Sequence, residues 1–266
     1  MIALGLLLAA ASAVAINGGY ALQHGAAAAL APLSLRRPLG SLRALASTRR
    51  WLVGFLSGIG GWVLYVVALR LAPLSIVQAA AAGGIGMLAI GGRLRFGERV
   101  GVGAALAGLV LLGLSLSAHT GTDRGSTTAV AAWLLASAAA APLVVRLLPA
   151  GAGFGTAAGV MYAAGDVGTK AAVFGGSRLW FVPPLLACHG LAFVCMQLAF
   201  QRGSRLTTAG LAVLWTNALP ILAGTAIFAE GLPAGSRGAL RVAAFVLVLI
   251  GAVALSRAAE PAALPA

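Results

Sequence analysis

Apolar residues form long runs along this chain, and short polar or arginine-containing segments separate the runs. An α-helix needs about 20 mainly apolar residues to cross the hydrocarbon core of a bilayer. Nine runs approach or exceed this length, so the pattern predicts nine transmembrane helices. They are expected over residues 2–22, 51–69, 74–92, 101–118, 128–148, 154–174, 179–200, 206–228 and 239–256.

The first run and the segment after it each allow a second interpretation. Small residues around 11–15 resemble a signal-peptide cleavage site, but neither Lys nor Arg precedes the run, so we favour a retained first helix. Residues 25–50 contain five Arg residues, and Pro32 and Pro38 interrupt any long helix there. We expect a cytoplasmic loop. The alternatives are a tenth helix, which reverses the topology before it, and a re-entrant helix.

The composition agrees with a membrane protein. Of the 266 residues, 61% are hydrophobic and 9% are charged, whereas about a quarter of the residues in a soluble domain are charged. The 37 glycine residues allow helices to approach closely in lipid, where water does not drive their association. The expected fold class is therefore an all-α integral membrane protein.

The net charge of +13 comes from arginine residues spread over the loops, which excludes a basic nucleic-acid-binding domain. Cytoplasmic loops of membrane proteins are enriched in Lys and Arg. Twelve arginines lie on the inner side if the N-terminus is outside: Arg36, Arg37, Arg43, Arg49, Arg50, Arg93, Arg95, Arg99, Arg146, Arg202, Arg205 and Arg257. Five lie on the outer side: Arg70, Arg124, Arg178, Arg237 and Arg241. This distribution predicts a multi-pass protein of the cell membrane with its C-terminus in the cytoplasm.

The two halves of the chain share a weak internal repeat. A shift of 132 residues aligns four pairs without a gap: Gly58 with Gly190, Arg70 with Arg202, Leu74 with Leu206 and Glu98 with Glu230. We interpret 1–266 as one polytopic domain in which four-helix repeats over 1–118 and 152–256 flank a linker helix at 128–148, with a short tail at 257–266. An odd number of crossings inverts the second copy, as in many secondary transporters, whose binding site lies near the midplane between the repeats.

Several segments resemble the drug/metabolite transporter superfamily of the EamA type. They are APLSIVQ, GGRLRFGERVGVGAALAGLVLLG and RLTTAGLAVLWTNALPILAGTAIFAEGL. The segments YAAGDVGTKA and MQLAF are similar to motifs of the NIPA-like magnesium-transporter branch of this superfamily. The resemblance implies nine helices and the transport of a small solute or of Mg²⁺.

Asp166 lies well inside an apolar run, and an acid at that depth is a candidate functional residue because an unpaired charge in lipid is costly. Tyr162 precedes it by four residues and Lys170 follows it by four, so the three share one helix face. Asp166 is therefore the expected substrate or proton site. The alternative is a structural pair of Asp166 with Lys170, because buried ion pairs are often structural.

Other polar residues within the apolar runs are candidates for a substrate cavity, either as ligands or as hydrogen-bonding contacts between helices. They are Asn17, Tyr20, Gln23, Tyr65, Gln78, Gln197, Trp215 and Asn217. His189 can share a helix face with Gln197, but we interpret this lone histidine as a core residue rather than a metal ligand.

The sequence contains no HExxH, P-loop or GxSxG motif, so we do not expect an enzyme. We expect a secondary transporter that works by alternating access, without a cofactor or a resident metal. The alternatives are a non-transporting scaffold subunit and a divalent-cation (Mg²⁺) transporter or channel. The expected partners are the lipid bilayer, a small-molecule or cation substrate and, as an open alternative, a second copy of the chain; nucleic acid is excluded.

Overall fold

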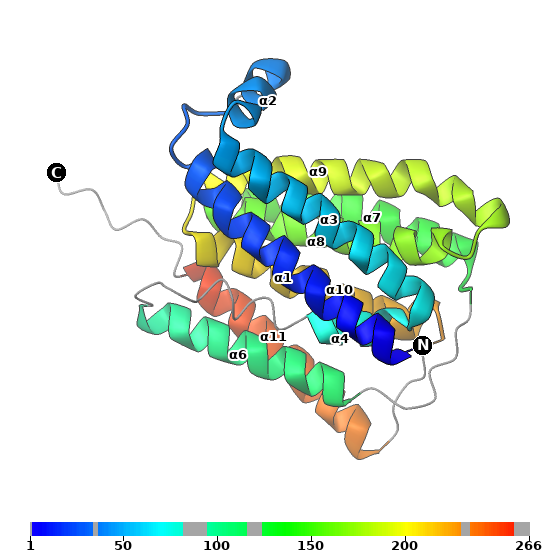
Figure 1. Cartoon of the computed structure of the whole chain (residues 1–266). Helices are drawn as coiled ribbons and strands as arrows, with labels where there is room; N and C mark the ends of the chain where they lie inside the picture. Colours follow the sequence, from blue (N-terminus) through cyan, green and yellow to red (C-terminus); the bar gives the residue numbers. More distant parts are fainter. Residues whose placement is uncertain (1, 34–36, 82–94, 116–123, 230–234, 258–266) are drawn as a thin grey trace.

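The computed structural model describes residues 2–33, 37–81, 95–115, 124–229 and 235–257, and every regular element in these ranges is a helix. The elements are α1 (Ile2–Ala27), α2 (Pro38–Ala46), α3 (Arg49–Leu71), α4 (Leu74–Ala81), α6 (Phe96–Leu114), α7 (Thr127–Leu147), α8 (Ala150–Ala172), the 3-10 helix η1 (Gly176–Phe181), α9 (Val182–Phe200), α10 (Arg205–Ile227) and α11 (Ser236–Arg257) (Figure 1). The expected all-α fold class is confirmed for the described part of the chain.

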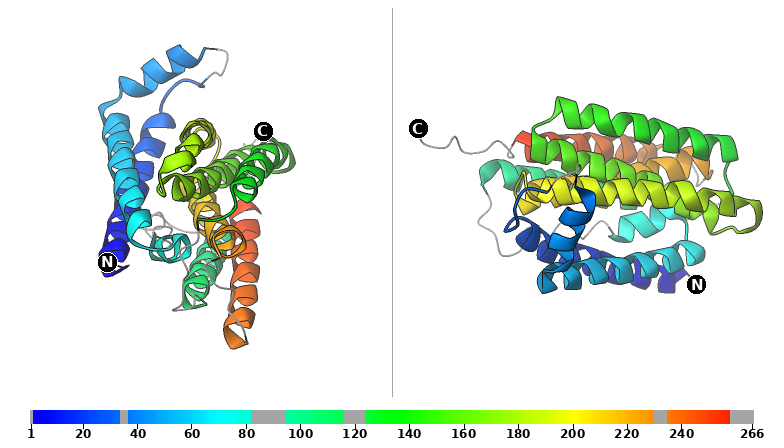
Figure 2. Two further views of the ribbon diagram at one scale, coloured as in Figure 1. Left: turned by 90° about the vertical axis from the view of Figure 1, so that its right-hand side faces the viewer. Right: turned by 90° about the horizontal axis from the view of Figure 1, so that it is seen from above.

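Six stretches of helix among the described residues are long and apolar enough to cross a membrane. They are Ala3–Ala27, Arg49–Leu71, Thr127–Leu147, Gly176–Phe200, Arg205–Ile227 and Ser236–Leu255. α6 and α8 lie alongside them in the same bundle (Figure 2). The expected helices at 74–92 and 101–118 extend into 82–94 and 116–123, outside the described residues, so the count of nine stays a prediction.

The bundle consists of helix pairs that pack around α8. α1 packs along α3, and α6 packs along α11, while α8 contacts α7, α9 and α10. Figures 1 and 2 show these pairs lying side by side. α8 is buried along almost its whole length, so its polar residues face other helices rather than lipid.

Several helix ends meet at one end of the bundle, which we call the basic end. There His24 of α1 contacts the carbonyl of Gly203 at 3.2 Å, and Gln201 Nε2 donates to the Ala27 carbonyl at 3.1 Å. The described arginines at this end are Arg37, Arg43, Arg49, Arg50, Arg95, Arg99, Arg146, Arg202, Arg205 and Arg257. Those at the opposite end are Arg70, Arg124, Arg178, Arg237 and Arg241. The arginines are thus concentrated at the end on the left of Figure 1, where α2 leaves the bundle.

The structure tests one part of the alternative for segment 25–50, a tenth transmembrane helix. α1 continues to Ala27, and α2 has only nine residues, whereas a membrane-crossing helix needs about 20. α2 projects from the basic end (Figure 1). A tenth transmembrane helix over the described residues of this segment is therefore excluded.

The N-terminal end of α6 differs from the expected boundary at residue 101. The helix begins at Phe96, and the Glu98 carboxylate accepts a hydrogen bond from the backbone N–H of Arg95 at 2.9 Å. An acid at the third helical position that binds the N-cap amide is one half of a capping box. The helix therefore begins almost one and a half turns before residue 101. Hydropathy alone did not assign this segment to the helix, because it contains the charged residues Glu98 and Arg99.

The expected helix over 179–200 begins with a different kind of helix. Residues Gly176–Phe181 form the 3-10 helix η1, and α9 begins at Val182. Pro183 and Pro184 lack a backbone N–H, so an α-helix tolerates them only in its first turn. The two prolines therefore set the start of α9.

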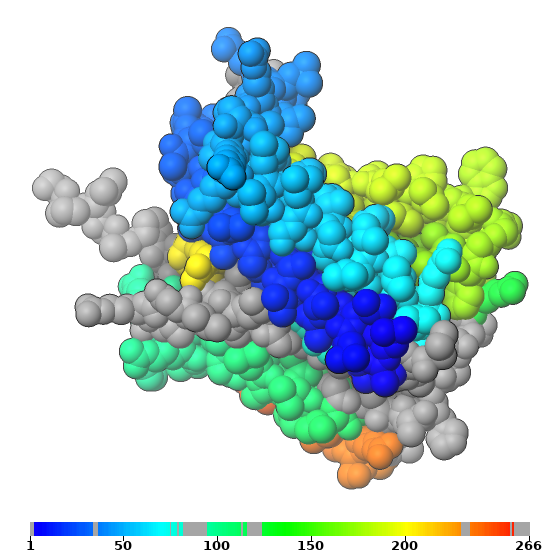
Figure 3. All heavy atoms as spheres, viewed as in Figure 1, coloured from blue at the N-terminus to red at the C-terminus, as the bar shows by residue number. Residues whose placement is uncertain are grey.

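Glycine brings α1 and α3 into backbone contact. A Cβ placed on Gly19 would lie 2.5 Å from the carbonyl oxygen of Gly54, and a Cβ on Gly54 would lie 2.6 Å from the carbonyl oxygen of Gly19. Figure 3 shows the two helices in contact along this face. Since apolar burial does not drive helix association in lipid, close approach of backbones supplies much of the packing energy.

The close crossing predicts opposite effects for two neighbouring glycines. Gly19→Ala forces the helices apart and is expected to reduce stability by about 1–3 kcal/mol, as overpacking does. Gly18 has nothing within 4 Å of an added Cβ, so Gly18→Ala is expected to be neutral or to stabilise the helix by up to about 1 kcal/mol. Thermal unfolding of both purified variants in detergent measures the difference, and equal melting temperatures would contradict the crossing.

Candidate substrate site

A cavity of about 670 Å³ lies between α1, α3, α4, α8, α9 and α10. Its walls are mainly apolar, and its polar lining residues are Ser12, Asn17, Tyr20, Gln23, Tyr65, Gln78, Tyr162, Asp166, His189, Thr216 and Asn217. On the side between α3 and α9, aromatic rings meet: Phe55 and Trp51 contact Phe193 at centroid distances of 5.5 and 6.1 Å. Eight of the eleven residues that the sequence analysis singled out therefore line one cavity.

Asp166 is buried in the wall of this cavity and interacts with side chains from three other helices. Gln78 of α4 donates from Nε2 to Asp166 Oδ2 at 2.9 Å and contacts the Tyr65 hydroxyl at 2.6 Å. The Tyr65 hydroxyl, on α3, also hydrogen-bonds to the Asp166 carboxylate. His189 Nε2, on α9, lies 3.6 Å from Asp166 Oδ1. The carboxylate thus joins α8 to α3, α4 and α9.

His189 is the cavity residue that sequence reasoning assigned to the core instead of to the site. Its Nδ1 lies 2.9 Å from the Leu185 carbonyl oxygen, which can only accept, so Nδ1 carries the hydrogen. Nε2 therefore faces Asp166. The ring also packs against Trp62 and Tyr162 at centroid distances of 5.6 and 5.8 Å.

Gly165 provides the space that His189 occupies. A Cβ on Gly165 would overlap the ring atoms Cε1 and Nδ1 of His189. The residue before Asp166 is therefore a glycine for a steric reason: a larger side chain displaces the imidazole that faces the carboxylate.

Lys170 has a different environment from the one that its spacing from Asp166 suggested. Its ammonium donates to the backbone carbonyls of Leu69 at 3.0 Å and of Ala72 at 3.2 Å. It also lies 5.7 Å from the ring centroid of Phe174. Carbonyls at the C-terminal end of a helix lack partners within the helix, so Lys170 caps the end of α3. It is not among the residues that line the cavity.

Gln197 and Trp215, two further predicted residues, also lie outside the cavity lining. Gln197 connects three helices, because its Nε2 donates to Gln23 Oε1 at 2.8 Å and its Oε1 accepts from Trp51 Nε1 at 2.9 Å. Trp215 packs against Gly159, whose added Cβ would lie 2.8 Å from the Trp215 Cβ. Gln197 therefore contacts neighbouring helices through hydrogen bonds, and Trp215 through packing.

Asn17 and Asn217 face the cavity from α1 and α10 with the same local geometry. Asn17 Nδ2 donates to the Ala13 carbonyl at 2.8 Å, and Asn217 Nδ2 donates to the Val213 carbonyl at 2.7 Å. Within the described part of the chain, neither Oδ1 atom has a hydrogen-bond partner, although both are buried. Leaving a buried acceptor unpaired costs about 1–3 kcal/mol. The indole Nε1 of Trp62, which also lines the cavity, is likewise buried without a partner among the described residues.

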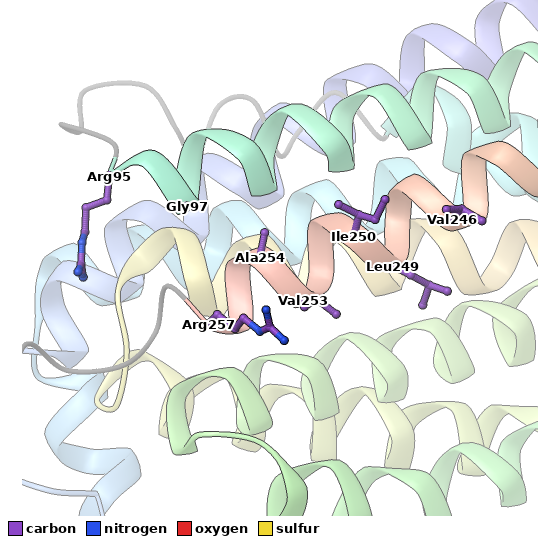
Figure 4. Close-up of a pocket in the computed structure, with 8 residues that line it drawn as sticks. All are labelled: Arg95, Gly97, Val246, Leu249, Ile250, Val253, Ala254 and Arg257. Carbon is purple, nitrogen blue, oxygen red and sulfur yellow. The ribbon is translucent and has the colours of Figure 1, made fainter.

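A second cavity of about 650 Å³ lies against α6 and α11 and shares no lining residue with the first. Its lining residues are Arg95, Gly97, Val246, Leu249, Ile250, Val253, Ala254 and Arg257 (Figure 4). The apolar residues among them lie on one exposed face of α11. It therefore has the character of a lipid-facing groove, with Arg95 and Arg257 as its charged lining residues.

The described residues contain no group of three or more His, Cys, Asp and Glu side chains that could hold a metal ion. Structural zinc sites have four protein ligands, and Ca²⁺ takes six to eight oxygen ligands. Mg²⁺ differs, because it retains several water molecules and binds through one or two carboxylates. The donor set around Asp166 suits a hydrated cation better than a dehydrated one.

The helices and the cavity of the described residues are those of a multi-pass membrane protein with an interior cavity that contains polar side chains. The chain is 25% identical, over 283 aligned residues, to a protein of Arabidopsis thaliana named probable magnesium transporter NIPA9. The alignment covers 94% of this chain and 81% of the plant protein. No protein-family profile and no solved structure matches the chain. The similarity agrees with the NIPA-like motifs of the sequence and supports a membrane transporter rather than an enzyme.

The contact between Gly165 and His189 predicts a double-mutant result. Gly165→Ala is expected to reduce stability by about 1–3 kcal/mol, because the new methyl group overlaps the imidazole. In a His189→Ala background the same substitution is expected to cost little, since the two residues interact directly. Thermal unfolding of the four proteins measures this coupling.

The control for this cycle is Gly190→Ala on the same helix as His189. Nothing lies within 4 Å of an added Cβ at Gly190, so its melting temperature is expected to match the wild type. An equal cost of Gly165→Ala with and without His189 would contradict the predicted contact.

Proposed function

We propose that this protein is a secondary transporter that moves a cation, with Mg²⁺ as the first candidate, and that Asp166 binds the cation. The observation that carries the proposal is a buried carboxylate in the wall of a 670 Å³ cavity between membrane-crossing helices. A charge at this depth is costly unless it faces water or a partner of opposite charge. An arriving cation supplies such a partner.

The surroundings of Asp166 support a cation rather than an anion or an apolar solute. The other polar groups lining the cavity include the amides of Asn17 and Asn217 and the hydroxyls of Tyr20 and Tyr162. Lys170 directs its ammonium to backbone carbonyls at the end of α3. Amide and hydroxyl oxygens bind the water molecules that Mg²⁺ keeps in its shell. The name of the plant relative agrees with this choice of ion.

Alternating access between two inverted repeats is the proposed mechanism, and the helix contacts support it. α1 packs on α3 in the first half, as α8 packs on α9 in the second. Across the halves, α4 contacts α10 and α6 contacts α11, while α1 contacts α9 and α3 contacts α8. The two halves correspond if α1, α3, α4 and α6 are matched in order to α8, α9, α10 and α11. Under this matching, exchanging the two halves leaves this set of contacts between the halves unchanged. Rocking of one repeat against the other would open the central cavity to either side.

Replacing Asp166 tests the site. Asp166→Asn keeps the shape of the side chain and removes its charge, so Mg²⁺ uptake into proteoliposomes is expected to fall at least about tenfold at equal amounts of folded protein. Glu98→Gln is the matched control, because it is also an acid-to-amide change but lies in the first turn of α6, outside the cavity lining. Its turnover per folded molecule is expected to stay near that of the wild type.

Each other outcome of this experiment has a distinct meaning. Full uptake by Asp166→Asn would refute Asp166 as the cation site. A wild-type protein that transports no cation or other solute would instead favour the scaffold subunit, which binds partners without transport.

The proposed orientation places the N-terminus outside and the basic end in the cytoplasm. Ser126 and Ser47 are exposed on opposite sides of this arrangement. In a background with Cys188 and Cys195 replaced by Ala, Ser126→Cys is expected to react with a membrane-impermeant maleimide on intact cells. Ser47→Cys is expected to react only after the cells are permeabilised. The reverse labelling pattern would overturn the orientation.

A further inference from the structure

Two buried amide oxygens of residues that line the cavity have no hydrogen-bond partner among the described residues, and they lie on different helices from Asp166. We propose that Asn17 and Asn217 form a second subsite, which holds the water shell of the divalent cation that Asp166 binds. This inference rests on the proposed function and extends it by assigning the residues that recognise the hydrated form of the ion.

The orientation of both amides follows from their neighbours. Each Nδ2 lies within 2.8 Å of the carbonyl oxygen four residues earlier in its own helix. A carbonyl oxygen only accepts hydrogen bonds, so the nitrogen must occupy that position and the oxygen must point the other way. The two side chains therefore present acceptors only, one from α1 and one from α10.

Hydrogen bonding between helices does not explain these oxygens. Both residues are 4% exposed, and within the described residues neither Oδ1 has a partner. By contrast, the oxygen of Gln23 in the same cavity accepts a hydrogen bond from Gln197. Buried polar groups in proteins are nearly always paired, and lipid offers no donor. In the proposed subsite the donor comes from a ligand that enters the cavity, since none of the described residues supplies it.

The chemistry of the site identifies the class of ligand. Two neutral oxygen acceptors repel an anion and contribute nothing to an apolar solute. They suit a donor, and the water molecules around a divalent cation are strong donors because the ion polarises them. Mg²⁺ gives up its water reluctantly, so a cavity lined by one carboxylate and two amide acceptors fits the hydrated ion. The carboxylate balances charge, while the two asparagines recognise the shell.

Isothermal titration calorimetry of Mg²⁺ binding to the full-length protein in detergent tests the subsite. Asn17→Leu and Asn217→Leu keep the approximate size and remove the oxygen. Each is expected to raise the Kd for Mg²⁺ about tenfold, without lowering the melting temperature of the unliganded protein. Asn17→Asp restores an oxygen acceptor and is expected to bind Mg²⁺ at least as tightly as the wild type.

Ser57→Ala is the control for a purely structural polar group, because the Ser57 hydroxyl donates to the Ala15 carbonyl across the α1–α3 contact at 2.7 Å. It is expected to lower the melting temperature and leave the Kd unchanged. Asparagine variants that behave like Ser57→Ala would overturn the subsite.

The titration also separates this inference from the proposed function. If Asp166→Asn abolishes Mg²⁺ binding while both leucine variants bind normally, the subsite is wrong and the proposed cation site stands. If the wild-type protein binds no Mg²⁺, both are overturned.

Discussion

The burial of one carboxylate among membrane-crossing helices is the constraint on which this structure depends. Lipid cannot solvate Asp166, so protein groups must do so. Gln78 and Tyr65 supply hydrogen bonds, and His189 brings an imidazole to 3.6 Å. These partners come from three helices, which places α8 at the centre of the bundle. The same arrangement leaves room for a cavity beside the carboxylate.

Small residues determine where the helices touch and where they do not. Gly19 and Gly54 bring the backbones of α1 and α3 into contact, and Gly165 admits the imidazole of His189. Between α3 and α9, aromatic rings such as Trp51 and Phe193 meet across the space. Large aromatic side chains thus form one side of the cavity, while glycines allow the close approach of α1 to α3.

The polar groups of the interior divide into those that hydrogen-bond to other helices and those without a partner among the described residues. Lys170 binds the carbonyls at the end of α3, and Gln197 connects α1, α3 and α9. The oxygens of Asn17 and Asn217 have no such partner among the described residues. Hydropathy ranks all these side chains alike, and only their neighbours distinguish the two groups.

Local patterns in the sequence were sufficient to predict the class of protein. The length of an apolar run and the spacing of its polar residues depend only on one helix and on whether lipid or water surrounds it. They predicted the all-helical membrane fold, most helix boundaries within a few residues, and Asp166 with seven other residues that line one cavity. Tertiary structure decided which groups meet. His189 faces Asp166, although 23 residues separate them, and Lys170 reaches α3 about 100 residues away. Such contacts depend on how helices that are distant in sequence cross one another. The spacing of residues within one helix carries no information about that crossing.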